Sequence, residues 1–149
     1  MSRPQALIVA LDVATRARDE ARRALQDARA SEQAAQDQMA QLQGYAAETQ
    51  GRWGMKAQAV VQPEVMFHHY QFMDRLNHAM DLQRGVMDDH AHRIQKAQEA
   101  LVAAEIRLAS LKKLVERRQQ ELMQRTLRQD QKQTDERASL ARHSATHFS

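Results

Sequence analysis

The sequence predicts an all-α protein, an antiparallel two-helix coiled-coil hairpin with an overhanging C-terminal helix. The first observation is a set of nine apolar residues at seven-residue spacing: Met66, Met73, Met80, Met87, Ile94, Leu101, Leu108, Val115 and Leu122. A second set, three residues further on, completes a seam with Leu76, Ala97, Ala104 and Leu111. A single helix cannot shield such a seam from water, so the pattern predicts a partner helix.

Composition and a single break in the pattern are the other two observations. Leu, Ile, Val and Phe supply only 27 of the 149 residues, whereas Ala, Glu, Lys, Leu and Arg supply 69. This composition is typical of long helices and excludes a thick core. Pro63 and two of the four glycines, Gly51 and Gly54, lie together between two patterned segments. One break therefore separates two helices, and a hairpin is favoured over the alternative, a parallel dimer of long rods.

The helix boundaries follow from local signals. Ser2 and Gln5 have the spacing of a capping box, so the first helix is expected from about residue 4 to about residue 50. Its seam from Leu7 to Trp53 is apolar at eleven of fourteen positions, and five of these are Ala. A turn region at about 51–62, a second helix at about 63–128 and a flexible tail at about 129–149 complete one coiled-coil domain.

The second helix is longer than the first, which predicts an uncovered stripe. A fold centred near residue 58 would place Leu7 opposite about residue 109. The seam would then continue without a partner over ~25 to 30 Å of helix, through Leu111, Val115 and Leu122. Between residues 107 and 128, seven basic residues stand against two acidic ones. An apolar stripe with basic flanks predicts an acidic protein partner.

Several function classes are not expected. The chain has no Cys, few Ser or Thr and no phosphate-binding loop, so no catalytic, cofactor-binding or metal-binding residues are predicted. Of the seven histidines, His69 and His90 occupy seam positions and the others are interpreted as solvated. The basic segment lacks aromatic residues, which argues against nucleic acid. No signal peptide or membrane span is recognisable, so a cytoplasmic protein without direct membrane insertion is expected.

Aromatic residues gather around the predicted turn. Five of the six in the chain fall within one region: Tyr45, Trp53, Phe67, Tyr70 and Phe72. Because a thin coiled coil can bury few large side chains, one or two of these are expected to stay exposed as anchors for another protein.

Three segments resemble the FliJ family, cytoplasmic coiled-coil proteins of the bacterial flagellar export apparatus. They are Leu42-Gln43-Gly44-Tyr45 followed by Gln50, the run YQFMDRLNHAMDLQ at 70–83, and the run RQDQKQTDERASLAR at 128–142. Their order and spacing extend the resemblance over essentially the whole chain. It implies a non-enzymatic stalk, similar in shape to the central stalk subunit of rotary ATPases, that acts in flagellum biogenesis, chemotaxis and type III protein export.

The resemblance also implies partners: the hexameric export ATPase, the cytoplasmic domain of the export gate, and export chaperones, with a peripheral location at the inner face of the cell membrane. It implies that the gate is bound by Gln38, Leu42, Tyr45, Phe72, Leu76 and Ala79. Thr49 and Gln83 stand where close relatives carry an aromatic residue and a His. Our hypothesis for the ATPase contact is Arg107, Leu111, Lys112, Lys113, Val115, Arg117 and Arg118.

Two alternatives share this architecture. One is the equivalent stalk protein of virulence type III secretion systems. The other is a prefoldin-like or structural coiled-coil chaperone subunit, whose overhang would bind unfolded clients. The overhang would also allow weak self-association of the free protein.

Overall fold

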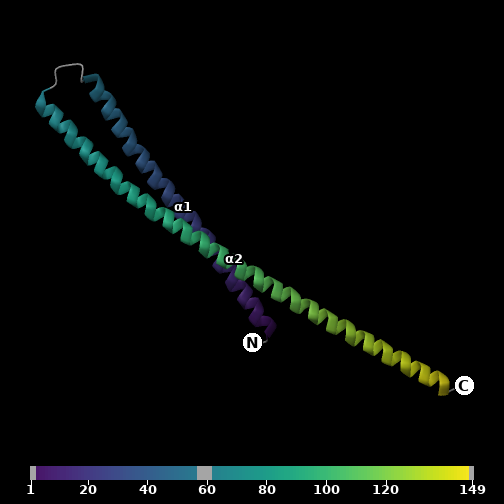
Figure 1. Ribbon diagram of the computed structural model, residues 1–149. Coiled ribbons are helices and arrows are strands. Elements are labelled where there is room, and N and C mark those ends of the chain that lie inside the picture. The colour runs from purple at the N-terminus through teal and green to yellow at the C-terminus, as the bar shows by residue number, and fades with distance from the viewer. Residues whose placement is uncertain (1–2, 57–61, 148–149) are drawn as a thin grey trace. The chain divides into compact units, whose positions relative to one another are not determined.

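The fold consists of two long α-helices. The computed structural model describes residues 3–56 and 62–147, and within these ranges it has no strand. The first helix, α1, spans Arg3–Lys56 and the second, α2, spans Pro63–His147 (Figure 1). The predicted all-α class and its division into two helices are confirmed.

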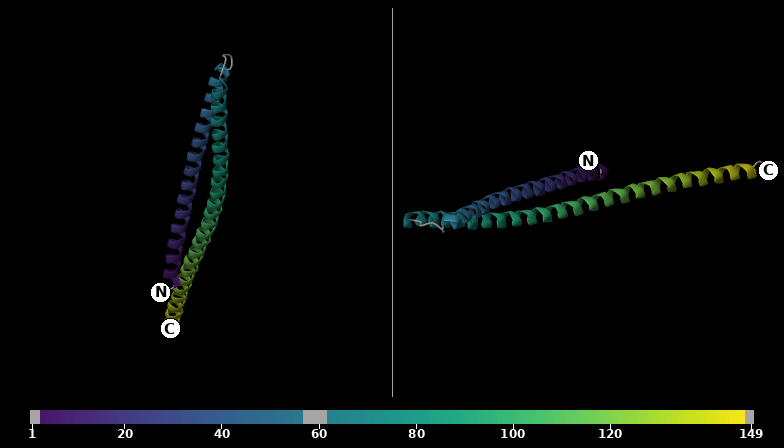
Figure 2. Two further views of the ribbon diagram at one scale, coloured as in Figure 1. Left: turned by 90° about the vertical axis from the view of Figure 1, so that its left-hand side faces the viewer. Right: turned by 90° about the horizontal axis from the view of Figure 1, so that it is seen from above.

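The packing of the two helices falls into two units. The hairpin unit comprises residues 17–104, and the terminal unit comprises residues 1–16 together with 105–149. In the hairpin unit, Trp53 near the end of α1 stacks on His69 near the start of α2, while Gln83 bonds to the Ala35 carbonyl oxygen. The helices therefore run antiparallel there, side by side in Figure 1 and in the left view of Figure 2.

The predicted seam is the core. Among the described residues, all nine buried apolar side chains occupy seam positions: Ala14, Leu25, Ala28, Ala35, Met39, Met73, Leu76, Met80 and Leu108. On α1 every seam position from Leu7 to Trp53 is buried or half-buried, and on α2 the same holds from His69 to Val115. Heptad spacing predicted this pattern because it keeps one stripe of each helix turned toward the other.

The two helices contribute unequally to the seam. The least exposed residues of α1 are Ala14, Ala28 and Ala35, which are only 2–3% exposed. The buried seam residues of α2 are larger: Met73, Leu76, Met80 and Leu108 are 4–9% exposed. Alternating small and large residues across facing helices is how a thin core reaches close packing.

The start of α2 has a local cause. Pro63 is its first residue, where a missing amide hydrogen costs nothing and the fixed φ suits a helix. The Gln62 carbonyl oxygen accepts hydrogen bonds from the amides of Val65 and Met66, at 3.1 and 3.2 Å. Glu64 adds a negative charge in the first turn, which favours the positive end of the helix dipole. The break predicted at Pro63 is thus confirmed.

The predicted limits of α1 and α2 need two corrections. α1 continues to Lys56 instead of ending near residue 50, so Gly51 is helical; of the predicted turn, residues 57–61 lie outside the described residues. α2 continues to His147, so the boundary predicted near residue 128 is wrong. No Pro or Gly follows Gly85 to end the helix, and polar pairs one turn apart, such as Gln131 with Asp135 at 3.0 Å, support it.

The register of the hairpin also differs from the prediction. Leu111, Leu114 and Val115 are half-buried in the terminal unit, and exposure is continuous only from residue 116 to residue 146. Leu7 shares a groove with Val115 and Leu122, so it does not lie opposite residue 109. In the hairpin unit the contacts of Ala35 with Gln83 and of Trp53 with His69 are centred on residues 59 and 61, beyond the centre at 58 that the prediction used. The uncovered overhang is real, but it begins beyond Val115, not at Leu111.

We expect Leu108→Ala to lower the free energy of unfolding by about 2 to 3 kcal/mol, because it leaves a cavity in the seam where Leu108 is 4% exposed. The matched control is Leu82→Ala on the same helix, where Leu82 is 61% exposed and outside the seam. This control should change stability by less than about 0.5 kcal/mol. Urea denaturation followed by circular dichroism measures both, and equal losses would contradict the seam.

Candidate functional site

A groove in the terminal unit is the first candidate site. It lies between the first turns of α1 and a segment of α2, and its volume is about 450 Å³. We call it the terminal groove; its lining is Pro4, Leu7, Ile8, Val115, Arg118, Gln119, Glu121, Leu122 and Arg125. Ile8 is 63% exposed and Leu122 65% exposed. Large apolar side chains that the chain itself leaves uncovered are typical of a protein-binding site.

The sequence explains why the seam opens at this point. Beyond Val115, the next seam positions of α2 are Arg118, Leu122 and Arg125. A guanidinium cannot be buried between two helices without a charged partner, so both arginines stay exposed. The seam therefore closes as far as Val115 and gives way to a groove with apolar walls and two arginines.

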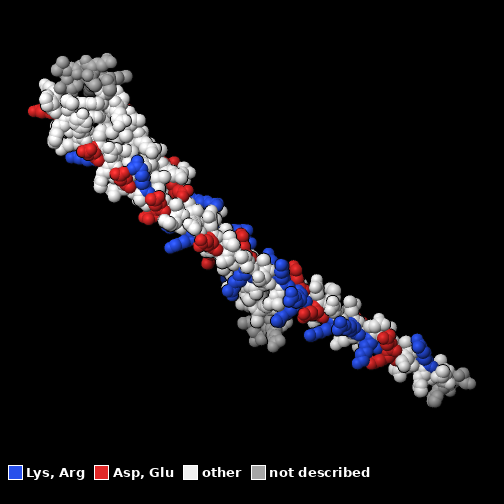
Figure 3. All heavy atoms as spheres, viewed as in Figure 1, with Lys and Arg blue, Asp and Glu red and all other residues white. Residues whose placement is uncertain are grey.

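Exposed basic side chains occur along the part of α2 that contributes to the terminal groove. Of the residues predicted for the ATPase contact, five are exposed: Arg107, Lys112, Lys113, Arg117 and Arg118. The other two, Leu111 and Val115, are half-buried. Figure 3 shows Lys and Arg side chains following the carboxy-terminal half of α2. Only Val115 and Arg118 of the predicted set line the groove itself.

The prediction missed most of the groove lining. The α1 side of the groove was not part of the predicted contact, and neither were the α2 residues Gln119, Glu121, Leu122 and Arg125. Leu7 and Leu122 were recognised as seam residues, so a signal was present. The register was the missing information, because only the corrected pairing brings the start of α1 to the level of Leu122.

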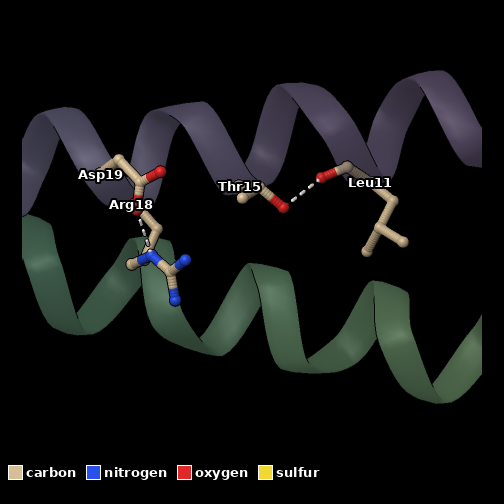
Figure 4. A network of polar contacts seen from close by, with 4 residues as sticks. All are labelled: Leu11, Thr15, Arg18 and Asp19. Atoms are coloured by element: carbon tan, nitrogen blue, oxygen red, sulfur yellow. Dashed lines mark hydrogen bonds and ion pairs between the residues drawn. The ribbon is translucent and has the colours of Figure 1, made fainter.

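Two half-buried polar residues of α1, Thr15 and Arg18, form hydrogen bonds within α1 itself. Figure 4 shows Leu11 and Arg18 on the face of α1 that is turned toward α2. The Arg18 Nε donates to Asp19 Oδ1 at 2.8 Å, and the Thr15 hydroxyl donates to the Leu11 carbonyl oxygen at 2.8 Å. Each polar group is paired within α1, so neither requires a partner on α2.

The second candidate site lies in the hairpin unit, where the resemblance implied a gate-binding surface. Segments 38–45 and 72–79 lie side by side, because Gln83 donates to Gln38 Oε1 at 3.2 Å and Trp53 stacks on His69 at their two ends. Tyr45 is 57% exposed and Phe72 46% exposed.

The other implied gate residues differ in accessibility. Gln38 is exposed, whereas Leu42 and Ala79 are half-buried at the edge of the seam. The Leu76 side chain is only 8% exposed and lies in the core beneath this surface. It is therefore not accessible to a partner. The accessible aromatic side chains of the implied gate residues are therefore Tyr45 and Phe72.

An aromatic cluster adjoins this surface. The rings of Trp53 and His69 are stacked with centroids 4.1 Å apart, and Tyr70 is tilted against Trp53 at 6.5 Å. Phe67 and Tyr70 remain 60% and 57% exposed. Four of the five aromatic residues near the turn are exposed, more than the one or two expected, and their role as anchors stays a prediction.

Within residues 3–56 and 62–147, no three His, Asp or Glu side chains gather closely enough to hold a metal ion. In the same part of the chain, neither helix includes an apolar stretch that could cross a lipid bilayer.

Comparison with known proteins gives one family and one structure. The family model described as "Flagellar FliJ protein" matches residues 4–146. A solved structure described as a YscO homolog, CT670 from Chlamydia trachomatis, is similar with a TM-score of 0.70 and 13% sequence identity. The similarity covers 98% of this chain and 94% of that chain, and at this identity it shows a shared fold. Among curated proteins, no sequence matches.

We expect His69→Ala to shift the fluorescence emission of Trp53 to longer wavelength, because loss of the stacked imidazole exposes the indole face to water. Trp53 is the only tryptophan in the chain, so its signal can be read without ambiguity. The control is His68→Ala, since the neighbouring His68 is exposed and is not stacked on Trp53. An unchanged spectrum for His69→Ala would contradict the stacking.

Proposed function

Because this chain belongs to the FliJ family of flagellar proteins, we propose that it is a non-enzymatic, stalk-like coiled coil that joins the hexameric export ATPase to the export gate. The observation that carries the proposal is the terminal groove, an apolar surface with basic flanks that the chain leaves uncovered. In this proposal the protein is cytoplasmic and reaches the membrane only through the export apparatus.

The terminal unit is the proposed ATPase-binding part. Seven basic residues stand against two acidic ones between residues 107 and 128, which favours association with an acidic surface. Two antiparallel helices are also narrow, since one helix with its side chains is about 10 to 12 Å wide. A narrow, basic end with an apolar groove suits insertion among the subunits of a ring.

The hairpin unit is the proposed gate-binding part. Tyr45 and Phe72 project from neighbouring helical segments and are both about half exposed. Exposed aromatic side chains over a rigid helical base are typical binding hot spots, because they bury a large area at little cost in conformational entropy. Gln38 adds a polar group, which already accepts a hydrogen bond from Gln83. Chaperone binding would use surfaces that these two contacts leave free.

A virulence secretion stalk is the second candidate. The two-helix fold, which this chain shares with CT670, would suit either candidate. The match to the flagellar family over residues 4–146 favours the export apparatus of the flagellum. A prefoldin-like chaperone is less well supported, because the terminal groove is small and its margin is charged. A chaperone of that kind would suppress the aggregation of unrelated proteins, which a light-scattering assay measures.

Replacing Arg107, Lys112, Lys113, Arg117 and Arg118 together by Glu should weaken binding to the purified export ATPase by about a hundredfold, because attraction becomes repulsion. Stimulation of ATP hydrolysis and of ring assembly should fall with it. The matched control reverses five exposed basic residues of the hairpin unit: Arg23, Arg29, Arg75, Arg93 and Lys96. If the two variants bind equally well, the terminal unit is not the ATPase contact.

Phe72→Ala and Tyr45→Ala should each weaken binding to the cytoplasmic domain of the export gate by about tenfold, as expected for half-exposed aromatic anchors. Phe67→Ala is the control, because Phe67 is similarly exposed and is not one of the implied gate residues. Isothermal titration calorimetry measures all three affinities. Equal affinities for the wild type and both anchor variants would exclude this surface.

A further inference from the structure

The shape of the terminal groove indicates what kind of segment fits it. Along α2, its lining residues Val115, Arg118, Gln119, Leu122 and Arg125 recur at intervals of three and four residues, so they share one helix face about 15 Å long. On α1 the lining residues Pro4, Leu7 and Ile8 follow the same spacing. Two helix faces with apolar side chains between them accept a third helix, as in the helix-in-groove mode of recognition.

The charges of the groove restrict the chemistry of that helix. Its lining holds two arginines and one carboxylate, Glu121. A helix that covered Arg118 and Arg125 without offering them carboxylates would leave two charges without partners, which is costly. The arginines are seven residues apart, or about 10.5 Å along the helix, so two carboxylates two turns apart would match them. Glu121 lies between them and repels an acidic residue placed at its own level.

We propose that the terminal groove binds one amphipathic acidic helix from a subunit of the export ATPase, which packs against α1 and α2 as a third helix. Its apolar face would cover Ile8 and Leu122, which are 63% and 65% exposed. Its carboxylates would pair with Arg118 and Arg125. This inference rests on the proposed function, because it takes the ATPase as the partner and specifies the segment and its chemistry.

Glutamate substitutions on the groove walls test the proposal. Leu122→Glu and Ile8→Glu each place a negative charge where the acidic helix would pack, so each should weaken binding to the purified hexameric ATPase at least about tenfold. Leu127→Glu is the matched control: Leu127 is 62% exposed on the same helix and does not line the groove. It should change affinity by less than about twofold. Since all three side chains are largely exposed, circular dichroism should show full helicity for each variant.

The outcomes separate this inference from the proposed function. If Leu122→Glu and Ile8→Glu bind like the wild type while the five-residue charge reversal abolishes binding, the groove proposal is overturned and the ATPase contact stands. If the charge reversal has no effect either, the proposed ATPase contact is overturned as well. A loss for Leu127→Glu equal to that for Leu122→Glu would mean that charge alone matters, and would also overturn the groove proposal.

Cross-linking identifies the bound segment directly. The chain has no Cys, so Ile8→Cys carries a single thiol to which a benzophenone maleimide can be attached. Irradiation of the labelled protein with the purified ATPase, followed by mass spectrometry, should give a product on a helix that carries carboxylates two turns apart. Cross-links to a loop, to a basic segment or to a second copy of this chain, or an absence of cross-links, would overturn the proposal.

Discussion

Burial of a single apolar stripe between two helices is the constraint on which the whole structure depends. There is no further layer in the described residues, so every buried apolar side chain belongs to the seam. Ala14, Ala28 and Ala35 are small enough to let the two helices approach closely, and larger buried side chains come from both helices: Leu25, Met39, Met73, Leu76, Met80 and Leu108. Apart from the half-buried Leu114, the large apolar residues described outside the seam are exposed and are therefore available to partners.

Polar residues at seam positions have different effects in the two units. Gln83 donates to the Ala35 carbonyl oxygen at 2.8 Å, a contact that holds the two helices in one register. The Nδ1 atom of His90, a polar group, is buried at its seam position. Arg118 and Arg125 cannot be accommodated in this way, because a full charge is far more expensive to bury. They end the seam, and the groove that results is the candidate binding site.

Sequence patterns predicted the buried residues better than the ends of the helices. Heptad spacing identified seam positions from Leu7 to Val115, and Pro63 marked the start of α2, because both signals are local. Gly51 was expected to belong to the turn, yet the last turns of α1 continue past it, where Trp53 packs on His69. That tertiary contact outweighs a helix cost for Gly of about 1 kcal/mol. The partner of Leu7 was misplaced because the fold was centred near residue 58, whereas the contacts of Ala35 with Gln83 and of Trp53 with His69 are centred on residues 59 and 61.

By itself, the sequence determined that this protein is two amphipathic helices, which face of each is buried, and that the carboxy-terminal half carries a basic excess. Only the tertiary structure decided the register, and with it that Leu111 and Val115 are partly covered while Ile8 and Leu122 share an open groove. The physical reason is that a seven-residue repeat looks the same after a shift of one heptad. The periodicity therefore defines the stripe, whereas the length of α1 and the cross-helix contacts define which residues meet along it.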